Sequence, residues 1–249
     1  MSKILFETCC GSADDIINSE KGGADRAELN SALYLGGLTP SIGELDIALE
    51  QATSIKVVTM VRPRQCGFAY SEADFEVMKR DAKLLLEHGS AGIVFGFLTL
   101  DGRVDEERCK AFMDIIGERE AIFHRAIDVV PDWREALDTL ICLGVKRVLT
   151  SGQKPRAIDG RETIRQMIDY AAGRIEILPG AGINESNARE LLAYTGANQL
   201  HMSKRKTCLD TSTLCNPSVN FGAPGSPADG AYETIDSENL KRVIGELRR

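Results

Sequence analysis

The chain has 249 residues, 43% hydrophobic and 27% charged, and its 37 acidic and 30 basic residues give a formal net charge of −7. This length can bury a full core in one domain, and the acidic balance without a basic run excludes nucleic acid and anionic membranes as expected partners. No signal peptide begins the chain and no apolar stretch approaches ~18 residues, so we expect a cytoplasmic protein.

Short runs of β-branched and apolar residues recur along the chain and predict eight strands. They cover residues 4–8, 26–29, 56–62, 92–98, 121–125, 147–151, 174–180 and 198–203. Helix patterns lie between them, and three begin with a serine followed three residues later by an acid, at Ser12, Ser41 and Ser71. Eight units of roughly 25 to 35 residues predict a closed parallel (β/α)8 barrel. A doubly wound open sheet would need a Gly-rich segment after a strand, whereas GGADR (22–26) precedes one.

Residues 203–236 interrupt this pattern. They carry no hydrophobic periodicity, are rich in Gly, Pro and Ser, and precede the last helix pattern at 237–247. Loops of this length are functional covers or disordered segments. Because the segment follows the eighth strand, it would leave the C-terminal face of the barrel. We therefore expect one domain over 1–249, with 203–236 a long loop or lid that is either ordered or disordered in the free protein.

Several strands are predicted to point charged and polar side chains into the barrel. In strand 26–29, Ala27 and Leu29 fit the outer face, which sends Arg26 and Glu28 inward. The same alternation directs further residues inward: Glu7, Cys9, Arg62, His124, Thr150 and His201. Barrel interiors are normally apolar, so these groups need partners or solvent, and most lie where barrel active sites form. Each alone fits a solvated or salt-bridging group, and Arg26 can pair with Glu28.

Two loops and one arginine add to this set. Residues 178–187 place Gly180 and Gly182 before a helix start, where backbone N–H groups of barrels often hold phosphate. Ser151 follows strand six and adds a hydroxyl. Arg125 alternates out of phase with His124, so either a bulge redirects it or it binds Asp128. Together with Arg62, these features favour an anionic ligand.

The cysteines do not form a disulfide framework. Seven of them lie at positions 9, 10, 66, 109, 142, 208 and 215, an odd number without a C-x-x-C pair. Cys9 and Cys10 are adjacent, so on a regular strand they face opposite sides and cannot chelate one Cu(I) ion. Chelation needs a turn at Cys10 or a third ligand such as Cys66 or His124. Burial in the core and a nucleophilic Cys9 beside His124 are the alternatives.

Motifs in order along the first 205 residues together resemble the CutC family of copper homeostasis proteins. The matching segments are GGADRAEL (22–29), GGLTPSIG (36–43), VRPR (61–64), YSEADFEVMKRD (70–81), DGRVD (101–105), FHRAID (123–128), RVLTSG (147–152) and PGAGI (179–183). This resemblance implies a cytoplasmic (β/α)8 barrel, usually a homodimer, that binds or handles Cu(I).

The resemblance also implies a set of site residues. The family's inner cluster corresponds to Glu7, Arg26, Glu28, Arg62, His124, Arg125, Asp128 and His201. Copper ligands would be sought at Cys9 and Cys10. Asn30 stands where family members often carry a cysteine, and Cys66 lies in a segment where others carry an acid, so one candidate thiol is lost and another is gained.

The residue chemistry supports an alternative, an enzyme of lyase or isomerase type that acts on a small phosphorylated or carboxylated metabolite. Arg62, with Arg125 and the loop around Gly180 and Gly182, would bind the anion, while Glu7 and His124 exchange protons. In this alternative Arg125 and Asp128 belong to the catalytic group, and Arg26, Glu28, Thr150, Ser151 and His201 to the binding group. A divalent metal on Glu7, Glu28, His124 and His201 is a variant that the arginines oppose, and an inactive scaffold is a third possibility.

Overall fold

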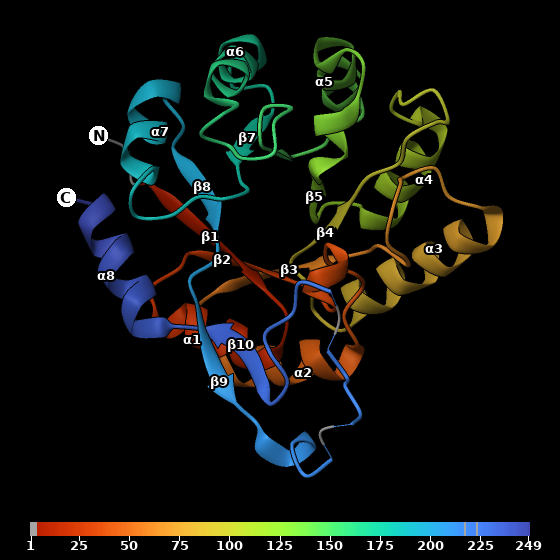
Figure 1. The fold of residues 1–249 in the computed structure, drawn as a ribbon. Coiled ribbons are helices and arrows are strands. Elements are labelled where there is room, and N and C mark those ends of the chain that lie inside the picture. Colours follow the sequence, from red (N-terminus) through yellow and green to blue (C-terminus); the bar gives the residue numbers. More distant parts are fainter. Residues whose placement is uncertain (1–3, 217, 223) are drawn as a thin grey trace.

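The computed structural model describes residues 4–216, 218–222 and 224–249. Eight parallel strands form a nearly closed barrel (Figure 1). The strands are β1 Leu5–Cys10, β2 Arg26–Leu29, β3 Lys56–Met60, β4 Gly92–Phe95, β5 Glu120–Phe123, β6 Arg147–Thr150, β7 Glu176–Pro179 and β8 Gln199–Met202. They pair in the order β7-β6-β5-β4-β3-β2-β1-β8. The eight strands and the barrel predicted from periodicity are confirmed.

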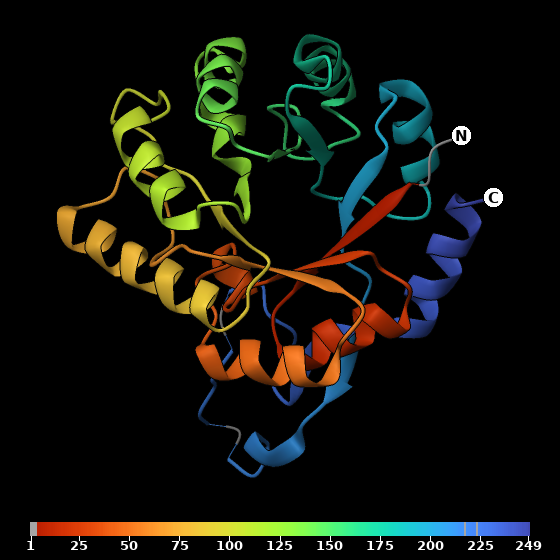
Figure 2. The same ribbon diagram turned by 180° about the vertical axis from the view of Figure 1, so that it is seen from behind.

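Eight helices follow the strands and lie on the outside of the barrel (Figure 2). They are α1 Ala13–Lys21, α2 Ile42–Gln51, α3 Glu72–Glu87, α4 Glu106–Ile116, α5 Trp133–Cys142, α6 Arg161–Ala171, α7 Ala188–Thr195 and α8 Ser237–Leu247, with short 3-10 helices η1 Leu33–Leu35, η2 Arg125–Val129 and η3 Thr211–Thr213. The side chains of Ser12, Ser41 and Ser71 accept the third backbone N–H of α1, α2 and α3, which confirms the predicted N-caps. In the described part of the chain, no helix is long and apolar enough to cross a membrane.

Alternation along the strands separates two apolar layers. Phe6, Ala27 and Leu29 belong to the large core between sheet and helices. A small second cluster of Val58, Met60, Val94 and Ile122 fills the barrel interior. The inward parity predicted for β1, β2, β3, β5 and β8 therefore holds.

Strand β6 has the opposite parity to the one predicted. Val148 packs in the outer core, whereas Leu149 lines the interior cavity, so Thr150 lies on the outer side and Arg147 points inward. Both Val148 and Leu149 are apolar, so hydrophobicity alone did not decide which of them faces the helices.

The segment expected to be a long loop contains a β-hairpin. Strands β9 Arg205–Leu209 and β10 Ala231–Ile235 pair antiparallel with Arg205 opposite Ile235. Most of its side chains are exposed or half-buried, and an exposed ribbon needs no alternating apolar face, which is why the sequence shows no period there. Residues 217 and 223 of this segment, and residues 1–3 of the predicted domain, lie outside the described residues.

Candidate functional site

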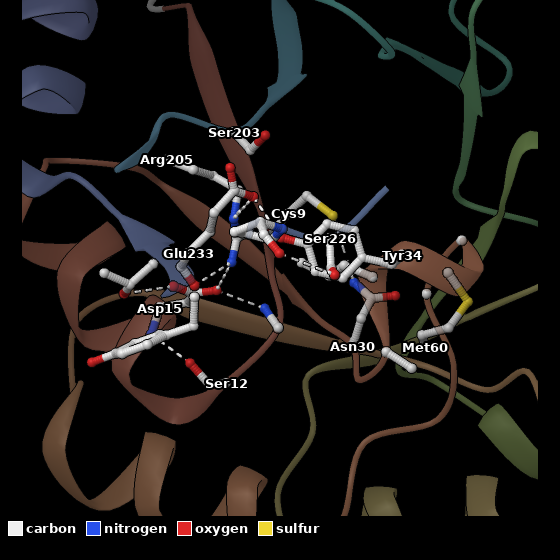
Figure 3. A pocket seen from close by; sticks show the side chains of 18 of the residues that line it. Cys9, Ser12, Asp15, Asn30, Tyr34, Met60, Ser203, Arg205, Ser226 and Glu233 are labelled. Carbon is white, nitrogen blue, oxygen red and sulfur yellow. Dashed lines mark hydrogen bonds and ion pairs between the residues drawn. The ribbon is translucent and has the colours of Figure 1, made fainter. Parts of the chain in front are cut away.

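A cavity of about 1150 Å³ opens at the carboxyl ends of the barrel strands (Figure 3). Its walls come from the ends of β1, β2, β3, β6 and β8 and from the loop around η1. The β9–β10 segment closes the remaining side, with Arg205, Phe221 and Glu233 among its lining residues. Segment 203–236 thus lies over the face where a barrel places its reactive groups.

Glu7 and His201 form the centre of the site. The adjacent pairing of β1 with β8 sets Glu7 opposite His201, and Glu7 Oε1 lies 2.9 Å from His201 Nδ1. Arg26 Nε donates to Glu7 Oε2 at 2.9 Å and Arg26 Nη2 to Gln199 at 2.6 Å. Burial alone would raise the pKa of Glu7, but the hydrogen bond and charge of His201, with Arg26 and Arg147, lower it to about 2. Glu7 is therefore held as a carboxylate that accepts from Arg26 and lies against His201.

His201 faces Cys9 and Glu28. Burial would lower its pKa, but hydrogen bonds with Cys9 and Glu7 raise it well above the ordinary value. One ligand atom each of Cys9, Glu28 and His201 lie within 4.8 Å of one another, the one such group of three among the described residues. Since Nδ1 is engaged with Glu7, Nε2 is the nitrogen that His201 can offer to an ion. A carboxylate on the far nitrogen is the usual support of a metal-binding histidine.

Glu28 is held differently from Glu7. Its Oε1 accepts from Asn30 Nδ2 at 2.9 Å, while its Oε2 is buried and has no hydrogen-bond partner. Burial raises the pKa of Glu28 despite the nearby His201. Asn30 Nδ2 also lies 3.9 Å from Cys9 Sγ, so the asparagine contacts both Glu28 and Cys9.

The predicted thiol set does not come together. Cys10 is fully buried on the outer side of β1, where its sulfur lies 3.3 Å from Ser19 Oγ and burial raises its pKa. Cys66 is exposed on the loop after β3 and does not line the cavity. Alternation on a regular strand is the physical reason that separates Cys9 from Cys10. Of the three predicted metal ligands, Cys9 alone joins the cluster with Glu28 and His201.

Arg62 and His124 lie at the ends of β3 and β5. Arg62 Nη1 donates to the carbonyls of Leu35 and Gly37 at 3.1 and 2.9 Å, and Nη2 to that of Cys66 at 3.0 Å. His124 Nδ1 accepts from Ala126 N at 3.1 Å. His124 is therefore the N-cap of η2, and β5 ends at the residue before it. Burial and the charge of Arg62 lower the pKa of His124 to about 3, so its ring is neutral.

The predicted catalytic residues Arg125 and Asp128 pair with each other, and Arg125 also lines the cavity. Asp128 accepts hydrogen bonds from Arg125, from the Thr150 hydroxyl and from Ser151 and Gln153. This carboxylate has its acceptor positions filled, so it ties the loop after β6 to η2. Of the two alternatives predicted for Arg125, a bulge in the strand or a bond to Asp128, the structure shows the bond to Asp128.

The predicted phosphate loop does not line the cavity. Gly180 N donates to Thr150 O at 2.9 Å, and Gly182 O accepts from Asn187 Nδ2 at 2.9 Å. A Cβ on Gly180 would lie 2.6 Å from Leu149 Cδ1 and 3.2 Å from His201 Cβ. Gly180 therefore makes room for His201, and Gly96 does the same for His124, where a Cβ would lie 2.4 Å from the ring.

Sequence reasoning missed Arg147, the largest fully buried side chain. Its Nε donates to Glu176 at 2.8 Å and its other nitrogens lie 3.2 Å from Glu120 and 3.9 Å from Glu7. The guanidinium lies beneath Glu7 and balances three carboxylates. Correct parity on β6 would have revealed it.

Known proteins resemble this chain over nearly its whole length. The family model described as the CutC family matches residues 4–206. A protein named as a family protein CutC from Treponema denticola is 47% identical over 99% of this chain and 100% of its own length. The human "Copper homeostasis protein cutC homolog" is 42% identical over 96% of this chain and 87% of its own. A crystal structure of a CutC protein from Streptococcus agalactiae superposes with a TM-score of 0.76 at 31% identity, covering 80% of this chain and 98% of that one.

Proposed function

The chain belongs to the CutC family, and from this premise we propose that it acts in copper homeostasis by binding Cu(I) at Cys9 and His201. Relatives named as copper homeostasis proteins support the role. The proposal includes a cytoplasmic location and a homodimeric state. Light scattering on the purified protein measures the mass, and a monomer would contradict the dimer.

The observation that carries the proposal is the grouping of Cys9, His201 and Glu28 within 4.8 Å at the cavity. A thiolate and an imidazole are ligands that suit copper, and thiolates favour the Cu(I) state. The carboxylate of Glu28 is a harder ligand than a thiolate or an imidazole, so we assign Cu(I) to the other two, and His201 must release its ring proton on binding. The site is half-exposed at Cys9 and opens to a cavity, as an ion that is taken up and released requires.

Charge does not prevent a cation from binding here. Arg26 is paired with Glu7, and Arg147 with Glu120 and Glu176, so the two arginines beneath the site are neutralised. Arg62 lies at the end of β3 instead, where its guanidinium is bound to backbone carbonyls. The arginines therefore repel a bound cation less than their number suggests.

Anaerobic titration of Cu(I) against a competing chelator tests the proposal. The background carries serine at the accessible Cys66, Cys142, Cys208 and Cys215, because exposed thiols bind Cu(I) at any position. In this background Cys9→Ser and His201→Gln should each weaken Cu(I) binding by at least about tenfold. Mutating a residue that only supports a metal ligand already costs about tenfold in affinity, so loss of the ligand itself should cost at least as much. His88→Gln, on the outer surface beside Asp46, is the matched histidine control and should change nothing.

Unchanged affinity in the Cys9→Ser variant would rule out this site. Affinity that falls for Cys9→Ser but not for His201→Gln would keep the thiol and remove the histidine from the ligand set. Retained thermal stability of each variant is the condition for reading either result.

A further inference from the structure

The other end of the cavity holds a buried positive charge without a counter-ion. Arg62 is 7% exposed, and no carboxylate lies within ion-pair distance of it among the residues that the structure describes. The guanidinium donates to the backbone carbonyls of Leu35, Gly37 and Cys66. Tyr70 lies beside the guanidinium; burial raises the pKa of Tyr70, and the charge of Arg62 acts in the opposite direction. Buried charges are usually paired, so this site favours an anion.

A hydrogen-bond donor without a partner lies beside this charge. His124 Nδ1 accepts from Ala126 N, so the ring hydrogen of the neutral imidazole is on Nε2. His124 is 4% exposed and its Nε2 has no partner. The ring atoms Nδ1 and Cε1 lie on the side of Gly96, and the His124 side chain lines the cavity. An unpaired buried donor is costly and is a mark of a ligand position.

Phe68 covers both groups. Its ring centroid lies 4.7 Å from that of His124 and 5.6 Å from Arg62 Cζ. The Phe68 backbone carbonyl is held by Leu98 N at 3.0 Å, while residues 65–67 before it are exposed. Phe68 also lines the cavity, so a ligand at this end would contact its ring.

We propose that this end of the cavity binds a small organic carboxylate, which accepts a hydrogen bond from His124 Nε2 and neutralises the charge of Arg62. The neutral donor His124 Nε2 and the positive charge of Arg62 together suit a carboxylate, which has two oxygens and a single negative charge. Phosphate needs more donors, and the glycines of the loop that would supply them, Gly180 and Gly182, do not line the cavity. This site uses residues other than Cys9 and His201, so it goes beyond the proposed copper binding and stands independently of it.

Calorimetric titration of the full chain with pyruvate, glycolate and acetate, and with inorganic phosphate, tests the proposal. Saturable binding of at least one carboxylate is expected. His124→Asn should weaken it by at least tenfold, because asparagine can still cap η2 but does not extend as far as Nε2. Arg62→Gln should weaken it as well. Arg64→Lys, beside the site but paired with Asp74, and Cys9→Ser should leave it unchanged.

A second readout separates a direct contact from a structural effect. The chain has three histidines, so nitrogen NMR resolves their rings, and the His124 Nε2–H signal should shift on titration while that of His88 stays. No saturable binding of any carboxylate, tighter binding of phosphate, or undiminished binding in a folded His124→Asn variant would overturn the proposal. Loss of Cu(I) binding in Cys9→Ser with carboxylate binding retained would show that the two sites are separate.

Discussion

Asp15 is expected to hold the β9–β10 hairpin over the cavity, and Asp15→Asn should release it. The Asp15 side chain is 1% exposed and accepts four hydrogen bonds. Oδ1 receives Ile235 N at 2.7 Å and the Thr234 hydroxyl at 2.9 Å, and Oδ2 receives Gly11 N at 2.8 Å and Arg205 Nη2 at 2.9 Å. Figure 3 shows Asp15 and Glu233 near Arg205, which pairs with both carboxylates.

The magnitude follows from the number of bonds lost. Asparagine keeps one oxygen, so two of the four donors would face an amide N–H₂ group. Each hydrogen bond to a charged group contributes about 1.5–3 kcal/mol, which gives a loss of about 3–5 kcal/mol concentrated at the hairpin. Because the loss is local, the hairpin should open below the free energy of global unfolding.

Native-state hydrogen exchange measures this directly. Amides of residues 205–209 and 231–235 should exchange faster in Asp15→Asn, while those of β4 and β5 keep their protection. Asp14→Asn, an exposed neighbour in the same first turn of α1, is the matched control and should behave as the wild type. Protection of the Ile235 amide within about 1 kcal/mol of the wild type would refute the reasoning, since this amide bonds to Asp15 itself.

Three further predictions concern the interior. Acidification from about pH 7.5 to about pH 5 should lower the free energy of unfolding by about 2 kcal/mol through His124. The folded pKa of His124, about 3, lies below the unfolded value of 6.5, so the unfolded chain binds the proton first. Urea titrations at both pH values should show a smaller loss of stability in His124→Asn. Arg147→Met should destabilise the fold by about 3–5 kcal/mol, because it leaves Glu7, Glu120 and Glu176 without their shared cation; in urea unfolding, a loss under about 1 kcal/mol would contradict this. Gly180→Ala should weaken Cu(I) binding, because the new methyl displaces His201 or Leu149. Gly67→Ala, which like Gly180 has no positive φ but has open space around it, is the control, and equal effects of the two would contradict the displacement.

Much of the fold follows from local signals in the sequence. Strand periodicity and serine N-caps act within a few residues, so they predict the eight strands and the helices between them. Alternation also predicts the inward direction of Glu7, Arg26 and Glu28, because their strand neighbours are clearly apolar. On β6 the neighbours Val148 and Leu149 are both apolar, which hid Arg147.

The partners within the site depend on contacts that sequence reasoning does not reach. Cys9 groups with His201 because β1 pairs with β8, about 190 residues along the chain, whereas the sequence suggested Cys10 or His124. The sequence identifies Asp15 as an acid that follows an N-cap serine. Its hydrogen bond to Ile235 N of β10, however, joins residues 220 positions apart. The first contact forms because the barrel closes between β1 and β8. The second forms because the β9–β10 hairpin folds back against α1.

Copper K-edge X-ray absorption of the Cu(I)-loaded protein tests the central claim most directly. In the variant without the accessible thiols, the account predicts one sulfur from Cys9 together with the scattering of one imidazole from His201, and loss of the imidazole signal in His201→Gln. Two or more sulfur ligands without imidazole scattering would place the copper elsewhere and contradict the assignment of this barrel site.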